Sequence, residues 1–154
     1  MTETIDLHLK KELIKKQRCF SRLTDEEITG LAGLLKETPF TVGDVIVTEG
    51  DIVDSVYFIV KGDAEVQHIR VKDGTHETEV IATLHPGQTI GLSETGFYSL
   101  TGLRTATVAA KTDMLTLRLG LSTFHGFALA NSHVSEVMRT NAQVLTDSTD
   151  TNNF

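Results

Sequence analysis

The stretch FTVGDVIVTEGDIVDSVYFIVKGDAEV, residues 40–66, decides the fold of this chain. Apolar and polar side chains alternate over short runs, which is the two-residue period of a β-strand. Glycine tolerates the positive φ that tight turns between such strands need. The runs are bounded by glycine followed by aspartate, at Gly43-Asp44, Gly50-Asp51 and Gly62-Asp63. Short strands at this spacing predict an antiparallel sandwich or barrel.

Further strand-like runs follow, and one irregular segment interrupts them. The runs DGTHETEVIATLHPGQ (73–88), TATVAA (105–110) and MLTLRL (114–119) keep the strand pattern. Between the first two lies TIGLSETGFYSLTGLR (89–104), which has three glycines and only two ionised side chains, Glu94 and Arg104. An irregular segment on a rigid β-scaffold is a common place for a binding loop.

Helical spacing marks both ends of the chain. Apolar residues recur on one face over residues 5–13, with lysines on the other faces, so an amphipathic helix is predicted there. Thr24, with Glu27 three residues later, predicts the capping box of a second helix. After the strands, two more helices are predicted, with Ser122 and Ser132 as their N-caps. The predicted order is helices, strands, helices.

Composition narrows the classes of protein open to this chain. Its 154 residues suit one domain, and 40% hydrophobic residues are enough for a buried core. The net charge of −7 disfavours a nucleic-acid partner, because an acidic surface repels phosphate backbones. One cysteine, Cys19, excludes a disulfide within the chain. No apolar signal core and no membrane-spanning run occur in the sequence, so we expect a cytoplasmic protein.

Four stretches combine a capped helix, glycine-bounded strands and an arginine that precedes two closing strands. They are FSRLTDEEITGLAGLL (20–35), the stretch 40–66, LHPGQTIG (84–91) and RTATVAAKTDMLTLRL (104–119). Their order and turn residues resemble the cyclic nucleotide-binding domain, the sensor shared by the catabolite activator protein, kinase regulatory subunits and cyclic-nucleotide-gated channels. The resemblance covers about Phe20 to Leu145, and Ile90 stands where the family usually has phenylalanine.

The resemblance implies a fold and a division of the chain. The fold is mainly β with flanking helices: an eight-stranded antiparallel jelly-roll barrel with N-terminal helices and two C-terminal helices. Residues 1–19 would form the N-terminal amphipathic helix, residues 20–146 the cyclic nucleotide-binding-like domain, and residues 147–154 a flexible tail. We therefore expect no output domain within this chain.

The family's pocket is the phosphate-binding cassette between the sixth and seventh strands, which maps here onto residues 90–107. The resemblance implies that Arg104 binds the cyclic phosphate. A guanidinium suits this role, because it can hydrogen-bond two phosphate oxygens in a fixed fork. The alternative for Arg104 is a structural salt bridge to Glu94 or Asp113. The candidate ligand-binding residues are Ile90, Gly91, Leu92, Ser93, Glu94, Arg104, Thr105 and Ala106.

The cassette departs from the family's pattern directly after Gly91. Cyclic nucleotide binders carry there a glutamate that accepts from the ribose 2′-hydroxyl, whereas this chain has Leu92. The segment from Gly91 to Arg104 is also longer than usual. Either Glu94 replaces the missing carboxylate after the loop rearranges, or the pocket binds weakly, binds another ligand or binds nothing. Losing one charge-assisted hydrogen bond costs about 1.5–3 kcal/mol, which weakens binding without abolishing it.

Signals for catalysis and for metal binding are missing from the sequence. The six histidines show no metal-ligand spacing, and no nucleophile elbow, P-loop or paired-carboxylate motif occurs. We therefore expect no catalytic residue, no metal and no cofactor. The expected protein is a non-enzyme whose ligand is cyclic AMP or cyclic GMP.

The functional hypothesis is a stand-alone sensor that binds a cyclic nucleotide and signals through movement of its C-terminal helix. A hinge near residues 126–132 would let residues 133–145 close as a lid or a dimer seam. Such coupling requires the ligand to bind the closed state better than the open one. The moving contact would be made by Val134, Val137, Met138 and Leu145.

The expected partners of such a sensor are a cyclic nucleotide and an unknown output protein. A homodimer is possible, and we expect neither nucleic acid nor a membrane as a partner. A transcription factor of the catabolite activator kind is disfavoured, because the chain ends at Phe154, before the helix-turn-helix that such proteins carry after the long helix. The alternative function is that of a degenerate cyclic nucleotide-binding fold, kept as a protein-interaction or dimerisation module without nucleotide.

Overall fold

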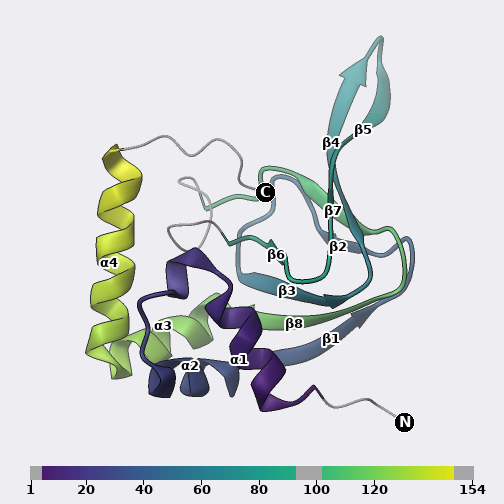
Figure 1. The fold of residues 1–154 in the computed structure, drawn as a ribbon. Helices are drawn as coiled ribbons and strands as arrows, with labels where there is room; N and C mark the ends of the chain where they lie inside the picture. The colour runs from purple at the N-terminus through teal and green to yellow at the C-terminus, as the bar shows by residue number, and fades with distance from the viewer. Residues whose placement is uncertain (1–4, 93–101, 148–154) are drawn as a thin grey trace.

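Two antiparallel sheets of four strands each form the barrel (Figure 1). The computed structural model describes residues 5–92 and 102–147. The first sheet has the order β1 (Lys36–Phe40), β8 (Met114–Gly120), β3 (Ser55–Lys61), β6 (Thr89–Ile90). The second has the order β2 (Val45–Val47), β7 (Thr107–Ala110), β4 (Ala64–Lys72), β5 (Thr75–Leu84). This arrangement of eight strands confirms the predicted mainly-β fold.

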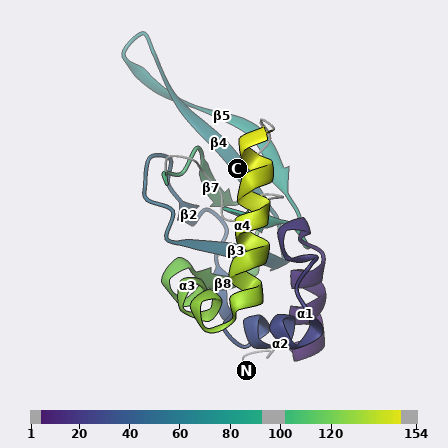
Figure 2. The same ribbon diagram turned by 90° about the vertical axis from the view of Figure 1, so that its left-hand side faces the viewer.

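Helices from both ends of the described chain gather beside the first sheet (Figures 1 and 2). They are α1 (Leu7–Lys15), the short 3-10 helix η1 (Arg18–Phe20), α2 (Asp25–Ala32), α3 (Leu121–Ala130) and α4 (Ser132–Asp147). Each helix predicted from the sequence is present, whereas η1 was not predicted. No helix of the described residues is long and apolar enough to cross a membrane.

The first sheet separates two hydrophobic cores, and strand alternation assigns each side chain of β3 to one of them. Val56 and Phe58 belong to the helical core, which the sheet shares with the helices. Tyr57 and Ile59 belong to the sheet core, which lies between the two sheets. The fully buried members of the helical core include Ile14, Phe20, Leu31 and Val134, and those of the sheet core include Ala64, Val66, Ile90 and Val108.

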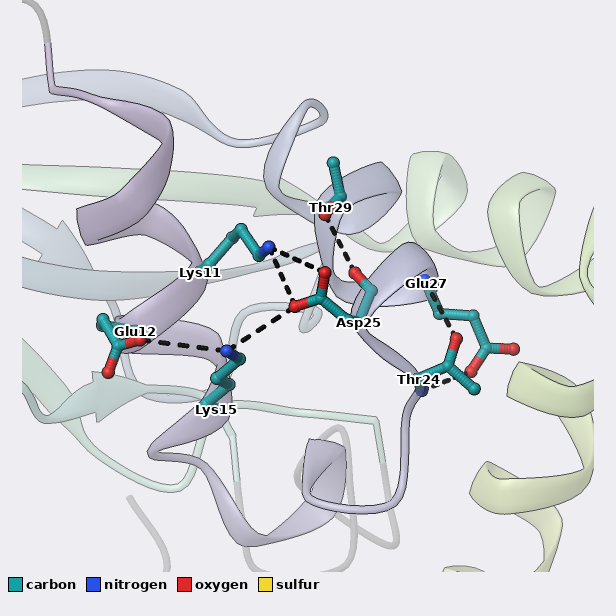
Figure 3. Close-up of polar contacts among 7 residues, drawn as sticks. All are labelled: Lys11, Glu12, Lys15, Thr24, Asp25, Glu27 and Thr29. Atoms are coloured by element: carbon teal, nitrogen blue, oxygen red, sulfur yellow. Dashed lines mark hydrogen bonds and ion pairs between the residues drawn. The ribbon is translucent and has the colours of Figure 1, made fainter.

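Charged side chains join α1 to the start of α2 (Figure 3). The Nζ atoms of Lys11 and Lys15 lie 2.9 and 3.6 Å from Oδ1 of Asp25. At the N-terminus of α2, Oγ1 of Thr24 accepts from the backbone N–H of Glu27 at 3.2 Å, and Oε1 of Glu27 accepts from the N–H of Thr24 at 2.8 Å. The predicted capping box at the start of α2 is therefore confirmed. The helix α1 packs against α2.

Both C-terminal helices begin earlier than predicted. The first residue of α3 is Leu121, with Gly120 at the N-cap, so the prediction of Ser122 as the cap is wrong. The N–H of Leu121 donates to the carbonyl of Asp54 at 2.8 Å, so a contact with the turn before β3 holds this helix start. The helix α4 includes Ser132 as its first residue, so Ser132 does not precede the helix as a cap would.

Most of the segment 126–132, where a hinge is predicted, is helical. Gly126 lies inside α3, and Asn131, with φ −130° and ψ 90°, is the residue that separates α3 from α4. Its side chain donates from Nδ2 to the carbonyl of Phe127 at 2.8 Å. The break between the helices therefore comes from one extended residue rather than from a glycine.

Tight turns close most of the strand connections. The predicted positive φ is found at Gly43, Gly50 and Gly62, and Gly87 also has a positive φ. Beyond the barrel, β4 and β5 continue as a two-stranded ribbon that projects away from both cores (Figure 1). The turns hold the strands in register and bring the ends of β3, β6 and β8 together, which is where the candidate site lies.

Candidate functional site

The backbone of Arg104 is fixed by the turn between β2 and β3. Its N–H donates to the carbonyl of Asp51 at 2.7 Å, and its carbonyl accepts from the N–H of Gly50 at 2.9 Å. An antiparallel bridge between Ile52 and Leu103 continues this pairing. The Gly50-Asp51 turn therefore positions Arg104, the last residue of the irregular segment 89–104.

The side chain of Arg104 is buried at the end of the first sheet, with 7% of its surface exposed. Nη2 donates to the carbonyl oxygen of Ser55 at 2.7 Å. Among the described residues, the nearest carboxylate contact is to Oδ1 of Asp54, 3.7 Å from Nη2, and the side chain of Asp54 is 74% exposed. Within the described part of the chain, the guanidinium is thus held mainly by a backbone carbonyl, with one longer contact to an exposed carboxylate.

One nitrogen of this guanidinium lacks a partner. Among the described residues, Nη1 of Arg104 is the buried side-chain polar atom with no hydrogen bond. Leaving a buried donor unsatisfied costs about 1–3 kcal/mol, and more for a charged group. A site that retains such a group is suited to an anionic ligand, which would supply the missing acceptor.

Burial also acts on the charge of Arg104. Desolvation lowers the pKa of the guanidinium below its ordinary value, and the negative charge of Asp54 opposes this shift. An arginine remains protonated at neutral pH, because its ordinary pKa lies far above 7. The site therefore holds a positive charge with little solvent around it, where attraction to an anion is stronger than in bulk water.

Gly91 lies directly against the unpartnered nitrogen. Its φ is +87°, and a Cβ atom at this position would lie 2.6 Å from Nη1 of Arg104. The same Cβ would lie 3.3 Å from the carbonyl oxygen of Ser55. Glycine is therefore required here both for the backbone conformation and for the close approach of the guanidinium.

The structure brings together only part of the predicted site. Gly91 and Arg104 adjoin, whereas the buried side chains of Ile90 and Ala106 pack in the sheet core. Thr105 is exposed. The partly buried side chain of Leu92 packs against the helical core. Ser93 and Glu94 lie outside the described residues.

The alternative salt bridge from Arg104 to Asp113 is wrong. The carboxylate of Asp113 accepts from the backbone N–H of Val42 at 2.9 Å, in the turn after β1. Among the described residues, the carboxylate that Arg104 approaches is Asp54, which was not predicted from the sequence, and the alternative partner Glu94 lies outside them. A signal was present, because Asp54 follows the Gly50-Asp51 turn within the deciding stretch.

Known proteins with related sequences point to one family. A family model described as the cyclic nucleotide-binding domain matches residues 37–131. The cGMP-dependent protein kinase of Plasmodium berghei (strain Anka) is 36% identical over 63 residues, which are 41% of this chain and 7% of the kinase. This chain therefore spans only a small part of that relative's length.

Solved structures share the fold. The N-terminal domain of a transcriptional regulator from Streptomyces coelicolor A3(2) superposes with a TM-score of 0.72 at 23% identity, over 88% of this chain and 91% of that chain. The regulatory domain of Toxoplasma gondii PKA, crystallised with cAMP, gives a TM-score of 0.67 at 19% identity, over 81% of this chain and 46% of that chain. Because the family model spans most of the barrel and more than half of the sequence, this chain belongs to the cyclic nucleotide-binding domain family.

Proposed function

We propose that this domain is a sensor that binds a cyclic nucleotide, cyclic AMP or cyclic GMP, with the cyclic phosphate on Arg104. The observation that carries the proposal is the buried, unpartnered Nη1 of Arg104 against the backbone of Gly91. A cyclic phosphate is a monoanion with two exposed oxygens, and a guanidinium can donate to both. Relatives named for cGMP and cAMP support this class of ligand.

The proposed signal passes from the cassette to α4 through the helical core. Leu92, next to Gly91, packs against the same core in which Val134 and Val137 of α4 are buried. A shift of the cassette on binding phosphate would therefore change the packing beneath α4. The single extended residue Asn131 is the natural pivot for such a movement.

Titration calorimetry and thermal unfolding with cyclic AMP and cyclic GMP test the proposal. We expect heat of binding and a rise in Tm with one or both ligands, because a ligand that binds only the folded state stabilises it by mass action. Arg104→Gln should lose at least 10-fold in affinity, since a hydrogen bond to a charged group contributes about 1.5–3 kcal/mol. The exposed Arg22→Gln is the matched control, and circular dichroism checks the fold of both variants. No heat and no change in Tm up to millimolar ligand would refute the sensor proposal.

A second candidate function is that of an interaction or dimerisation module without nucleotide. The observation that favours it is Leu92, an apolar residue packed on the helical core at the position where binders of the family carry the ribose-contacting glutamate. Arg104→Glu separates the two functions. It should abolish ligand-dependent stabilisation in a sensor, whereas an interaction module would keep its association in sedimentation experiments unchanged.

A further inference from the structure

A second arginine, Arg118, lies on the inner face of the first sheet. Its neighbours in β8, Leu117 and Leu119, both belong to the helical core. Because successive side chains of a strand point to opposite faces, Arg118 points toward the space between the two sheets. Its cross-strand partner on β3 is Tyr57, a member of the sheet core. A charged side chain at this inward position calls for an explanation.

The guanidinium of Arg118 extends toward the residues that hold Arg104. Nη1 of Arg118 lies 3.7 Å from the position that a Cβ atom of Gly120 would occupy. Gly120 pairs in register with Ser55, and the carbonyl of Ser55 accepts the hydrogen bond from Arg104. Two guanidinium groups therefore converge on one end of the barrel, one from the segment before β7 and one from β8.

The described residues neutralise this pair of cations only in part. Arg118 makes no ion pair within the described part of the chain, and its partner on β1 is another cation, Lys36, which is exposed. The carboxylate closest to either guanidinium in an ion pair is Asp54, 3.7 Å from Arg104. Burial is the main cause that lowers the pKa of Arg104, and the charge of Arg118 lowers it further while Asp54 and Asp51 oppose it.

We propose that Arg118 is a second anion-binding residue of this site, so that the ligand's phosphate is bound by two guanidinium groups. The inference rests on the proposed function of the site and adds a residue that the chain supplies from β8. The two arginines and Asp54, the carboxylate that forms an ion pair with them among the described residues, leave one positive charge, which matches the single negative charge of a cyclic phosphate. In the absence of a ligand the two cations repel each other, and an anion between them converts that repulsion into attraction.

Two variants at Arg118 test the proposal. Arg118→Met removes the charge and keeps most of the apolar stem, whereas Arg118→Lys keeps the charge. We expect Arg118→Met to bind cyclic AMP or cyclic GMP at least 10-fold more weakly, with a weaker dependence of affinity on salt, because one cation fewer contacts the phosphate. Arg118→Lys should lie between Arg118→Met and the wild type. The control Arg22→Gln should bind as the wild type does.

A ligand-free measurement provides a second readout. If the two guanidinium groups repel each other, Arg118→Met without ligand should unfold at a higher urea concentration than the wild type, although it binds ligand less well. Unchanged affinity for cyclic nucleotides in a folded Arg118→Met variant would overturn the proposal. A loss of affinity together with a large loss of ligand-free stability would also overturn it, because it would indicate a structural role only.

The failure of the proposed function is distinguishable from the failure of this inference. If the wild type binds neither cyclic nucleotide, the sensor proposal fails, and the anion site is measured with sodium sulfate against sodium chloride at equal ionic strength. Greater stabilisation of the wild type than of Arg118→Met by sulfate would support Arg118 as an anion-binding residue. Equal stabilisation of the two proteins, or none in either, would contradict it.

Discussion

Replacing Gly91 with alanine should destabilise the domain and remove its response to ligand. The backbone at Gly91 has a φ of +87°, a conformation that costs an L-residue about 1–2 kcal/mol. The new Cβ would also lie 2.6 Å from Nη1 of Arg104, so the guanidinium must shift, and we expect it to lose its 2.7 Å hydrogen bond to the carbonyl of Ser55. That bond involves a charged donor and contributes about 1.5–3 kcal/mol. The free energy of unfolding should therefore fall by about 2.5–5 kcal/mol.

Gly43 offers a matched control. Its φ is +92°, and a Cβ atom there would have no neighbour within 4 Å. In Gly43→Ala the free energy of unfolding should therefore fall only by the cost of the backbone conformation, about 1–2 kcal/mol, and the response to ligand should remain. Urea unfolding measures the stability of both variants, and calorimetry with cyclic AMP and cyclic GMP measures the response. Equal losses of stability in the two variants, with the ligand response intact in both, would show that Arg104 is not held against Gly91.

Two further predictions concern the start of α2. Thr24→Ala removes the side-chain acceptor of the capping box and should lower the free energy of unfolding by roughly 1 kcal/mol, whereas Thr24→Ser should restore most of it in the same urea titration. Glu27 predicts a pH effect: burial works to raise its pKa, but hydrogen bonds from Thr24 and His133 outweigh it and hold the pKa below its ordinary value. The ionised Glu27 carboxylate therefore stabilises the folded state fully above its unfolded pKa of about 4.3. This stabilisation is lost as the pH falls through the lower pKa of Glu27 in the folded state. In the Glu27→Gln variant, the free energy of unfolding should fall less steeply as the pH is lowered through this range. A pH dependence identical to that of the wild type would contradict the role given to Glu27.

Features that depend on residues close together in the sequence could be predicted from the sequence alone. The capping box of Thr24 and Glu27 spans three positions, and its two hydrogen bonds are those expected from the pattern. The turn glycines were also predictable, because the need for positive φ arises within one short turn. The start of α3 was not, because its first N–H is bound by the carbonyl of Asp54, which is far away in the sequence.

The residues of the candidate site likewise fall into those that could be predicted from the sequence and those that could not. Arg104 and Gly91 were identified from the sequence because the motif around them resembles a known cassette. Asp54 and Arg118 were missed, because each approaches the site only when distant strands pair. A signal for Arg118 was available, since it is a charged residue at an inward position of the run MLTLRL, but the inward face is known only once β8 has its partners.

The sequence by itself determined that glycine-bounded strands would form a barrel between helices and that one arginine would follow the irregular segment. These features depend on φ preferences, strand period and capping, which act over a few residues. Only the tertiary structure decided that Nη1 of Arg104 would be buried without a partner among the described residues, with Gly91 against it and Arg118 on β8. The physical reason is that the environment of a charge is made by residues far apart in the chain, such as Arg104 and Ser55, which are separated by 49 positions.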